Sequence, residues 1–378
     1  MDEYQRHQII WRALYPVVHG FLCRKFHFTH DQLEVKGPCL IISNHVTNWD
    51  PLLVAMSLKH KQTYFVASEH IFRWGWLSKL LHWLLGPIAR KKASSAAGTV
   101  MECMRHLKDG HSIGLFAEGD CTWNGITGSV FPATGKLAKS SGASLVTYRL
   151  EGGYLTFPRW TTKMRKGQMH GHVVHIYSPE ELKSMSAKEV TAAINRDIYE
   201  NSWENQTLHP IPYYGKELAS GMESAISLCP ACHRFGDLQS RGDLFYCDCG
   251  FSVRYLPTGF FSPAQPFRHI AEWDAWQAAE IAKLAGKEKE MFFQDTDVTL
   301  IRVEDGHKDT VLGTGLLDQF IDHISCAGQT FAYQDISDMA MVQNHMLLFT
   351  CKDVYYQLKT AKGKNLRKYL LFWQQHRS

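Results

Sequence analysis

Over residues 38–204, short runs of consecutive apolar residues alternate with stretches in which apolar residues recur every three or four positions. The runs, such as residues 39–42 and 144–150, predict buried strands, and the stretches between them predict helices. One of these helices opens with Ser186 and Glu189, which have the spacing of a capping box. Strands that alternate with helices in this way indicate an α/β domain with a largely parallel sheet flanked by helices.

The same patterns predict further elements in the first 210 residues. The predicted strands cover residues 62–67, 111–116 and 172–177, and the predicted helices cover residues 4–28, 71–85, 93–109 and 134–140, with another beginning at Pro51. The helix over 4–28 is amphipathic. We therefore assign residues 1–210 to one domain that begins with an N-terminal amphipathic helix.

Beyond residue 210 the pattern changes. Residues 211–228 hold prolines, glycines and serines, which are typical of a linker. Residues 256–378 are expected to form a helix over 268–290, strands over 298–303, 329–333, 346–350 and 354–358, and a helix over 365–375. Several short strands before one terminal helix suggest a small β-rich module of pleckstrin-homology-like type, an analogy that leaves its function open.

Four cysteines lie between these two segments, within residues 229–255. Cys229 and Cys232 form one pair, Cys247 and Cys249 form the other, and fourteen residues separate the pairs. Two closely spaced pairs can supply four thiolates to a tetrahedral zinc ion, and the alternative is four separate thiols. Since four thiolates leave no open coordination position, we expect a structural zinc in a small zinc-ribbon-like segment.

Composition places this chain of 378 residues among folded globular proteins, with 45% hydrophobic and 21% charged residues. The net charge of +4 is unevenly distributed. Residues 1–210 contain 24 Lys and Arg against 17 Asp and Glu, whereas residues 211–378 contain 17 against 20. The first part is therefore expected to meet an anionic surface or substrate, and we expect no nucleic-acid partner.

Cellular location is suggested by what the sequence lacks and by one helix. No signal peptide is evident, no uncharged apolar run approaches the ~18 residues of a membrane span, and the ten cysteines are expected to be reduced in a cytoplasmic compartment. The helix predicted over 71–85 is rich in Trp and Leu, and residues 51–92 carry seven Lys or Arg and one Glu. We expect this helix to lie on an anionic membrane, at its inner face; the alternative is a core helix of a soluble enzyme.

Candidate chemistry lies at the turn that follows the strand predicted over residues 39–42. His45 and Asp50 are five residues apart there, just before the helix expected from Pro51. At such a turn the imidazole can meet the carboxylate, which would hold it in the tautomer that a general base needs. The alternative is structural, with Asp50 capping the helix and His45 buried with its hydrogen bonds satisfied.

The same His-x-x-x-x-Asp spacing occurs again at His269 and Asp274. Both of these residues lie in a predicted helix, where five residues turn about 140° and the two side chains diverge. The spacing is therefore weak evidence by itself. Only the first occurrence has a context that would bring the two groups together.

Three further blocks follow the His45 turn in order: Gly86 with Arg90, the sequence Phe-Ala-Glu-Gly-Asp-Cys over residues 116–121, and Phe131 with Gly135 ahead of an apolar strand. Together with Asn-His-Val-Thr-Asn-Trp-Asp over residues 44–50, these blocks resemble the glycerolipid acyltransferase family, which contains the lysophosphatidate (1-acylglycerol-3-phosphate) acyltransferases. The resemblance covers roughly residues 30–200, about half of the chain.

This resemblance implies an O-acyltransferase of phospholipid biosynthesis, which moves a fatty acyl group from acyl-CoA or acyl-carrier protein to the hydroxyl of a lyso-glycerolipid. His45 would act as the general base and Asp50 would orient it. Arg90, Glu118 and Gly119 would bind the acceptor. We expect direct transfer, in which the acceptor hydroxyl attacks the thioester and no protein nucleophile takes part.

The third block departs from the family's usual Phe-Pro-Glu-Gly-Thr-Arg, because Asp120 and Cys121 stand where Thr and Arg are usual. An Arg would hold a phosphate through two hydrogen bonds, and Asp would repel it. Arg90, with Lys91 and Lys92, could still hold a phosphate. A lyso-lipid without a phosphate, such as an aminoacyl lipid, is an alternative acceptor. A non-catalytic lipid-binding or scaffold protein with the same fold is an alternative of another class.

Overall fold

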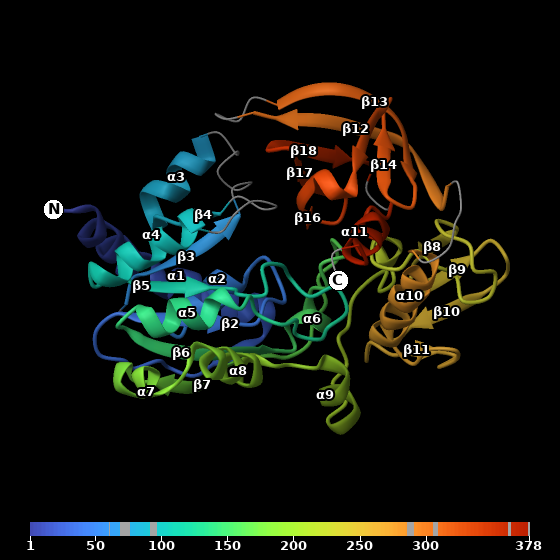
Figure 1. The fold of residues 1–378 in the computed structure, drawn as a ribbon. Coiled ribbons are helices and arrows are strands. Elements are labelled where there is room, and N and C mark those ends of the chain that lie inside the picture. Colours follow the sequence, from blue (N-terminus) through green and yellow to red (C-terminus); the bar gives the residue numbers. More distant parts are fainter. Residues whose placement is uncertain are drawn as a thin grey trace. The chain divides into compact units, whose positions relative to one another are not determined.

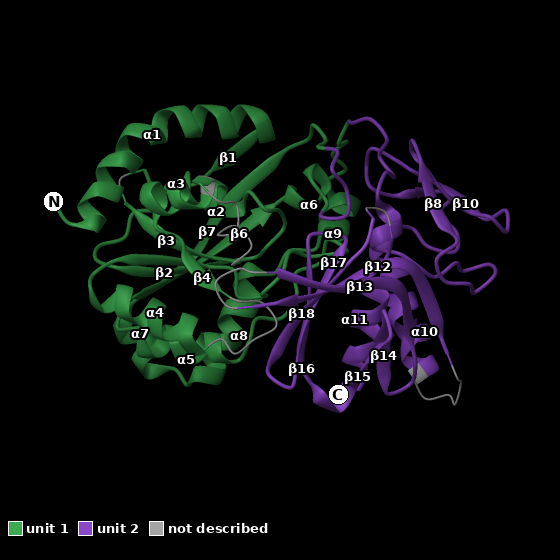
Figure 2. Ribbon diagram, turned by 90° about the horizontal axis from the view of Figure 1, so that it is seen from above, with its two compact units in different colours: residues 1–91, 95–158, 164–214 green, residues 92–94, 159–163, 215–378 purple. Residues whose placement is uncertain are grey.

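The structure is a computed structural model that describes residues 1–59, 61–68, 76–90, 97–285, 291–304, 309–361 and 364–376 (Figure 1). The chain folds into two compact units, which Figure 2 colours separately. Unit 1 comprises Met1–Lys91, Ser95–Pro158 and Met164–Tyr214. Unit 2 comprises Lys92–Ser94, Arg159–Lys163 and Gly215–Ser378.

Unit 1 is built on one seven-stranded sheet with the strand order β1-β7-β6-β2-β5-β3-β4. The strands are β1 (Phe28–His30), β2 (Cys39–Ser43), β3 (Thr63–Ser68), β4 (Ile88–Arg90), β5 (Ser112–Leu115), β6 (Ser144–Glu151) and β7 (Met169–Tyr177). Every neighbouring pair is parallel except β6 and β7. The predicted α/β domain with a largely parallel sheet is therefore confirmed. Strands β1 and β4 were not predicted, because three residues are too few for a pattern.

The helices of unit 1 are α1 (Glu3–Phe26), α2 (Asp50–Ala55), α3 (Trp76–Leu85), α4 (Ala97–Lys108), α5 (Ala133–Ser140), α6 (Gly153–Thr156), α7 (Pro179–Ser184), α8 (Ala187–Ile198) and α9 (Ser202–Leu208). The capping box predicted for α8 is present, since the Ser186 and Glu189 side chains each accept from the other's backbone N–H. The parts of the predicted helices over residues 71–75 and 93–96 lie outside the described residues.

Strand β2 lies at the centre of this sheet, and all five of its residues are buried. Leu40 and Ile42 belong to an apolar cluster shared with α4, α5 and α8, whereas Cys39 and Ile41 belong to a second cluster shared with α1 and α2. Helices thus cover both faces of the sheet. This explains why the strand is a continuous apolar run and not an alternating one.

Unit 2 contains two antiparallel sheets. The four-stranded sheet has the order β11-β10-β9-β8 and consists of β8 (Leu238–Arg241), β9 (Leu244–Cys247), β10 (Ser252–Tyr255) and β11 (Phe261–Ser262). The seven-stranded sheet has the order β15-β14-β13-β12-β18-β17-β16. Its strands are β12 (Phe293–Val303), β13 (Asp309–Gln319), β14 (His323–Cys326), β15 (Gln329–Ala332), β16 (Ile336–Val342), β17 (Met346–Cys351) and β18 (Val354–Lys359).

Two helices complete unit 2, α10 (Ile270–Ala285) before the larger sheet and α11 (Arg367–Gln374) after it. The predicted continuation of α10 over residues 286–290 lies outside the described residues. A strand-rich C-terminal sheet followed by one helix is therefore present. Strands β13, β14 and β16, which the sequence pattern missed, complete the sheet. Its pleckstrin-homology-like identity stays a proposal.

The segment expected as a linker, residues 211–228, is divided between the units. Tyr213 belongs to unit 1, where its hydroxyl donates to the Gln168 carbonyl at 2.8 Å. From Gly215 onward the chain belongs to unit 2, where Met222 and Ile226 are fully buried. The structure places the zinc-ribbon-like segment and the β-rich module within this same unit. Met222 and Ile226 are four residues apart, and this spacing in the sequence could have indicated that the segment packs into a core.

Unit 2 also takes in the short segment Arg159–Lys163, which is far from the rest of the unit in sequence. Trp160 is fully buried there, and its ring lies 5.9 Å from the Tyr255 ring, centroid to centroid. Its carbonyl accepts from the Asn344 side chain at 3.2 Å. The segment is therefore an integral part of the core of unit 2.

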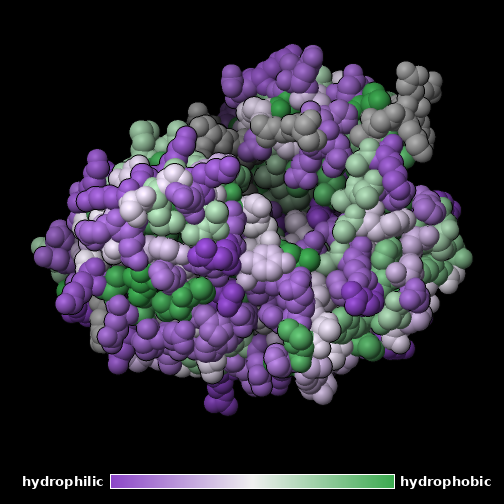
Figure 3. Space-filling view, turned by 60° about the horizontal axis from the view of Figure 1, so that its bottom comes forward, coloured by the Kyte–Doolittle hydropathy of each residue, from purple (hydrophilic) through white to green (hydrophobic). Residues whose placement is uncertain are grey.

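The surface of the protein is mixed in character. Hydrophilic residues predominate on the face shown in Figure 3, and hydrophobic residues form smaller groups among them, as is usual for globular proteins. Large exposed apolar side chains of α1 and α3 are Ile9, Leu14, Val17, Phe21, Trp76, Leu80 and Trp83. Among the described residues, no helix combines the length and the apolar content that crossing a bilayer requires.

The second His-x-x-x-x-Asp spacing serves the core of unit 2. His269 stands just before α10, and its Nε2 lies 3.6 Å from the carboxylate of Glu272. Both carboxylate oxygens of Asp274 instead accept from the guanidinium of Arg367, and both partners are buried. Asp274 is thus engaged in a buried ion pair with Arg367.

Candidate active site

The turn after β2 begins with Asn44, whose side chain ties the turn to strand β6. Its Nδ2 donates to the Leu150 carbonyl at 2.9 Å, and its Oδ1 accepts from the Leu150 N–H at 2.7 Å. Asn44 is completely buried, so these bonds also satisfy polar atoms that water cannot reach. The side chain continues the β2–β6 pairing beyond Ser43, and His45 therefore leaves the sheet from a fixed position.

The carboxylate of Asp50 gathers the turn around itself. It accepts from the His45 Nδ1 at 2.7 Å, from the Val46 N–H at 2.6 Å, from the Thr47 N–H at 2.9 Å and from the Thr47 hydroxyl at 2.7 Å. Asp50 is the first residue of α2, whose N-cap is Trp49, so the alternative interpretation of Asp50 as the N-cap is wrong. Its carboxylate accepts hydrogen bonds from the backbone N–H groups of the loop that precedes the helix.

The ring of His45 is held on both sides. Because its Nδ1 faces a carboxylate, that nitrogen carries the hydrogen, and Nε2 is left to accept a proton. The ring stacks on Phe116 with centroids 4.5 Å apart, and the Cys121 Sγ lies 3.4 Å from Nε2. Burial by itself would lower the pKa of His45, but Cys121 and Asp50 outweigh it and hold that pKa well above its usual range.

Glu118 fastens this turn to a second loop. One of its carboxylate oxygens accepts from the His45 N–H at 2.6 Å, and the other accepts from the Gly128 N–H at 2.6 Å. Burial raises the pKa of Glu118 to about 7, against the lowering effect of these two backbone bonds. Both oxygens are engaged with the backbone, so in this structure Glu118 positions His45. Its predicted contact with the acceptor stays a prediction.

Gly119 allows Arg90 and Phe131 to approach the same place. Gly119 has a φ of +83°, and a Cβ placed on it would lie 2.6 Å from the Phe131 ring and 3.5 Å from the Arg90 Nη1. A side chain at residue 119 would therefore clash as well as strain the backbone. The Arg90 guanidinium lies over the Phe131 ring, 5.1 Å from its centroid. Lys91 and Lys92, which we expected to assist Arg90, lie outside the described residues.

The structure thus brings residues from each of the four sequence blocks into one site, with Phe131 representing the fourth block beside Arg90 and Gly119. His45 and Asp50 are in direct contact, Glu118 is bonded to the His45 backbone, and Arg90 lies beside Gly119. One residue of the site was missed. In the sequence, Cys121 was noted only as a departure from a family pattern. It lies three residues after Glu118, which was already assigned to the site, and this short distance could have indicated that Cys121 belongs to the site too.

An apolar pocket of about 540 Å³ opens beside the turn. Asn48, Trp49 and Leu52 of the turn and of α2 contribute to its wall, with Phe65 of β3 and Leu85 of α3 among the other residues. A mostly apolar pocket of this size is typical of a small-molecule site. It shares its wall with the turn that holds His45.

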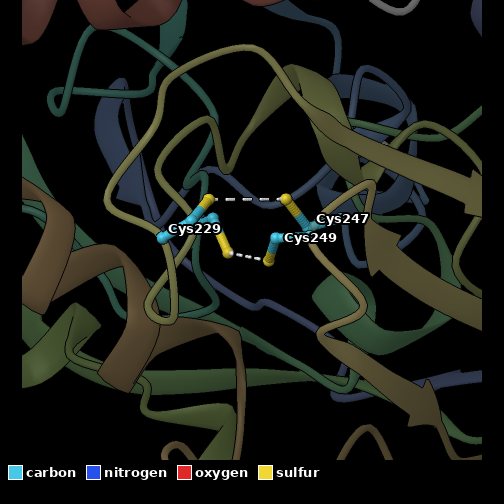
Figure 4. A group of neighbouring side chains, drawn as sticks. Cys229, Cys247 and Cys249 are labelled. Atoms are coloured by element: carbon cyan, nitrogen blue, oxygen red, sulfur yellow. Dashed lines mark hydrogen bonds between the residues drawn. The ribbon is translucent and has the colours of Figure 1, made fainter.

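Four of the cysteines of unit 2, Cys229, Cys232, Cys247 and Cys249, form one cluster; Figure 4 labels three of them. Cys229 and Cys232 lie on one turn, Cys247 ends β9, and Cys249 lies in the turn that follows. Sulfur-to-sulfur distances are 3.7 Å for Cys229 with Cys249 and for Cys232 with Cys247. A tetrahedral zinc ion with Zn–S bonds of ~2.3 Å holds its sulfurs about 3.8 Å apart. The donor set therefore fits zinc.

Residues 25–151 match the protein-family model described as Acyltransferase. Among solved structures, the chain is similar to the 1-acyl-sn-glycerophosphate (LPA) acyltransferase PlsC from Thermotoga maritima, with 16% sequence identity and a TM-score of 0.41. That similarity covers 50% of this chain and 79% of the other.

The family match covers the part of unit 1 in which the site is built. His45, Asp50, Arg90, Glu118 and Gly119 all fall within it. The class of the protein follows from this coincidence. The chain carries an acyltransferase domain, and the protein is an acyltransferase enzyme.

Replacing Asp50 with Asn is expected to lower the pKa of His45, because a carboxylate stabilises the imidazolium and a neutral amide does not. His45 is protonated below its raised pKa and loses the proton as the pH rises through it, so the variant loses that proton at lower pH. An NMR titration of the labelled imidazole, assigned with His45→Ala, measures the shift. The exposed Asp31→Asn is the control, and an unchanged His45 titration in Asp50→Asn contradicts this assignment.

Proposed function

We propose that the protein is an O-acyltransferase that moves a fatty acyl group from acyl-CoA or acyl-carrier protein to the hydroxyl of a lyso-glycerolipid in phospholipid biosynthesis. The observation that carries this proposal is the contact between Asp50 and His45, within the residues that match the acyltransferase model. A buried carboxylate fixes the tautomer of the ring, so Nε2 is aimed to take a proton.

The chemistry assigned to His45 follows from the groups that react. A hydroxyl is a poor nucleophile while it keeps its proton, and His45 removes that proton as the oxygen attacks an acyl carbonyl. Asp50 stabilises the imidazolium that forms. The thiol that leaves the donor ionises near ~8.5, so it needs little help from an acid. Backbone N–H groups near the turn are the proposed donors to the oxyanion.

The acyl chain of the donor is proposed to occupy the apolar pocket beside the turn. Trp49 and Leu52 form part of its wall and adjoin the residues that hold the base, so a chain in this pocket would end near His45. A fatty acyl chain has no polar groups to satisfy, which suits an apolar lining.

The acceptor head group is proposed to lie against Arg90, beside Gly119. A guanidinium there can hold a phosphate through two hydrogen bonds. Cys121 stands where the family has a second cationic group, an Arg, and Asp120 adds a carboxylate, which together favour a head group of lower negative charge. A lyso-lipid without a phosphate, such as an aminoacyl lipid, is therefore the second candidate acceptor.

The protein is proposed to act at the surface of an anionic membrane, bound peripherally from the cytoplasmic side. Val17 on α1 is 72% exposed, and Trp76 on α3 is 76% exposed. Arg6 lies over the ring of Trp83, 5.7 Å from its centroid, so a cationic group accompanies the exposed apolar ones. Exposed aromatic and basic side chains on surface helices are the make-up of an interfacial contact.

The four-cysteine site of unit 2 is proposed to hold one structural zinc ion. Cys229, Cys232, Cys247 and Cys249 would fill its tetrahedral shell and leave no position for a substrate. The ion would join the turn that carries the first pair to the end of β9, which carries the second. Its contribution would be to the stability of the small sheet.

Activity is tested by following thiol release from acyl-CoA and from acyl-carrier protein with a panel of lyso-lipid acceptors. His45→Ala is expected to lose about 10²–10⁴-fold in rate because the general base is gone, whereas the exposed His209→Ala keeps the wild-type rate. Phosphate-bearing and phosphate-free acceptors are compared, and Arg90→Ala is expected to raise KM for the former. Equal rates for wild type and His45→Ala with every donor and acceptor would contradict the proposed function.

Membrane contact is tested by sedimentation with vesicles that contain anionic lipid. Val17→Ser combined with Trp76→Ser is expected to weaken binding about tenfold or more, since burying one large apolar side chain contributes about 1.5–3 kcal/mol. Added salt is expected to weaken binding further. Val311→Ser, at an exposed apolar position in unit 2 (63% exposed), is the control. Undiminished sedimentation of the double variant argues against this surface.

Zinc is tested by elemental analysis of the freshly purified protein, which is expected to carry about one zinc per chain. Cys229→Ser combined with Cys232→Ser is expected to lose the metal and to lower the melting temperature, because binding of the ion contributes to folding. Cys351→Ala, at a cysteine outside the cluster, keeps the metal. Almost no zinc in the freshly purified wild-type protein would contradict the proposed zinc site.

A further inference from the structure

Cys121 completes a row of three groups that the sequence pattern did not reveal. Its Sγ lies 3.4 Å from the His45 Nε2, and the Nδ1 of the same ring lies 2.7 Å from the Asp50 carboxylate. A sulfur, an imidazole and a carboxylate in this order have the geometry of an activated nucleophile, its base and the group that orients the base.

The backbone holds the sulfur at this distance. The Thr122 N–H donates to the His45 carbonyl at 2.9 Å, so the residue after Cys121 is bonded to the residue that carries the base. Glu118, three residues before Cys121, is bonded to the His45 N–H. The loop is thus fastened to His45 on both sides of Cys121. The thiol also lies 3.9 Å from the Asn48 Oδ1, on the same turn.

The position of the Cys121 sulfur limits how the acceptor hydroxyl can give its proton to His45. Nδ1 is committed to Asp50, so Nε2 is the nitrogen that can take a proton, and Cys121 lies at that nitrogen. In direct transfer the acceptor hydroxyl would have to displace the thiol from Nε2. If the sulfur is acylated first, it has no proton left to give, and Nε2 becomes available to the hydroxyl.

We propose that Cys121 is a catalytic nucleophile that carries the acyl group as a thioester between donor and acceptor. This inference rests on the proposed acyltransferase function and deepens it by naming the covalent intermediate. It replaces the direct transfer expected from the family resemblance. The base remains His45, which acts once in each of two successive steps.

Each step transfers one proton and exchanges one bond. In the first, the Cys121 thiol gives its proton to His45, and the sulfur attacks the carbonyl of the donor thioester. The bond to the donor sulfur breaks, and the departing thiolate takes the proton from His45. In the second, the acceptor hydroxyl gives its proton to His45, and its oxygen attacks the acyl-Cys121 carbonyl. The bond to Cys121 breaks, the ester is released, and Cys121 recovers the proton.

The surroundings of the ring agree with this role. Cys121 and Asp50 hold the pKa of His45 above its usual range against the effect of burial, which favours transfer of the thiol proton to the ring, and an imidazolium stabilises the thiolate that attacks a thioester. The His45 side chain is 19% exposed, so reactants can reach it. Cys103 offers a contrast within the same unit, because it is buried in the core and burial raises its pKa to about 12.

Trapping the intermediate tests the proposal directly. The full-length protein is mixed with acyl-CoA in the absence of acceptor, quenched in acid and examined by intact mass spectrometry and peptide mapping. We expect the mass of one acyl group on Cys121, removed by neutral hydroxylamine and transferred when a lyso-lipid is added. Cys103→Ala is expected to acylate as the wild type does, and Cys121→Ala is expected not to acylate.

Two variants separate a nucleophile from a residue that only positions His45. Cys121→Ala is expected to lose at least about 10²-fold in turnover while its melting temperature stays that of the wild type. Cys121→Ser places a hydroxyl beside the base, so any acyl group that it takes forms an ester that neutral hydroxylamine leaves in place. Initial rates of the wild type are expected to follow ping-pong kinetics, with parallel lines in double-reciprocal plots.

Failure of this inference is distinguishable from failure of the proposed function. Full turnover by Cys121→Ala, with His45→Ala inactive, overturns the nucleophile and leaves the acyltransferase intact. Loss of turnover in Cys121→Ala without any acylated wild-type protein assigns Cys121 a positioning role and also overturns the nucleophile. A wild type that cleaves no thioester with any acceptor overturns the proposed function itself.

Discussion

The buried carboxylate of Asp50 is the constraint on which the site depends. A charge that water cannot reach must be compensated by donors, and here they are a histidine ring, a hydroxyl and the N–H groups of two neighbouring residues. Satisfying one side chain therefore folds the whole turn around it. The orientation of His45 is a consequence of that compensation, and the base cannot rotate without leaving the carboxylate short of a donor.

The sheet of unit 1 fixes the positions of the loops that form the site. Strand β2 is buried on both faces, so the turn at its end starts from the centre of the packed core of unit 1. Strand β5 runs parallel to β2, and its end delivers Glu118 to the His45 backbone. Because the ends of parallel strands meet at one edge of a sheet, residues far apart in sequence become neighbours there. The site is an assembly of loops fixed by strands.

Much of unit 1 was predictable because its buried strands are continuous apolar runs, because its helices are long enough to show a period, and because four blocks occurred in a fixed order. Contacts at the ends of those elements were not predictable. The bond from Glu118 to the His45 N–H joins residues 73 positions apart, and no local pattern reports it. In the sequence Cys121 marked only the absence of a phosphate-binding Arg, since a pattern shows which residue is absent and not what its replacement touches. Residues 211–228 were predicted to be a linker because proline, glycine and serine suggest an exposed segment. Met222 and Ile226 within it are nevertheless buried.

The segment Arg159–Lys163 makes the two units interdependent in a way that their boundaries conceal. The chain leaves unit 1 after Pro158, places Trp160 in the core of unit 2, and returns to unit 1 at Met164. A fragment that began at Gly215 would lack this indole, and losing a buried Trp costs about 3–5 kcal/mol. The C-terminal unit is therefore not a separable attachment, because an insertion from the acyltransferase half completes its interior.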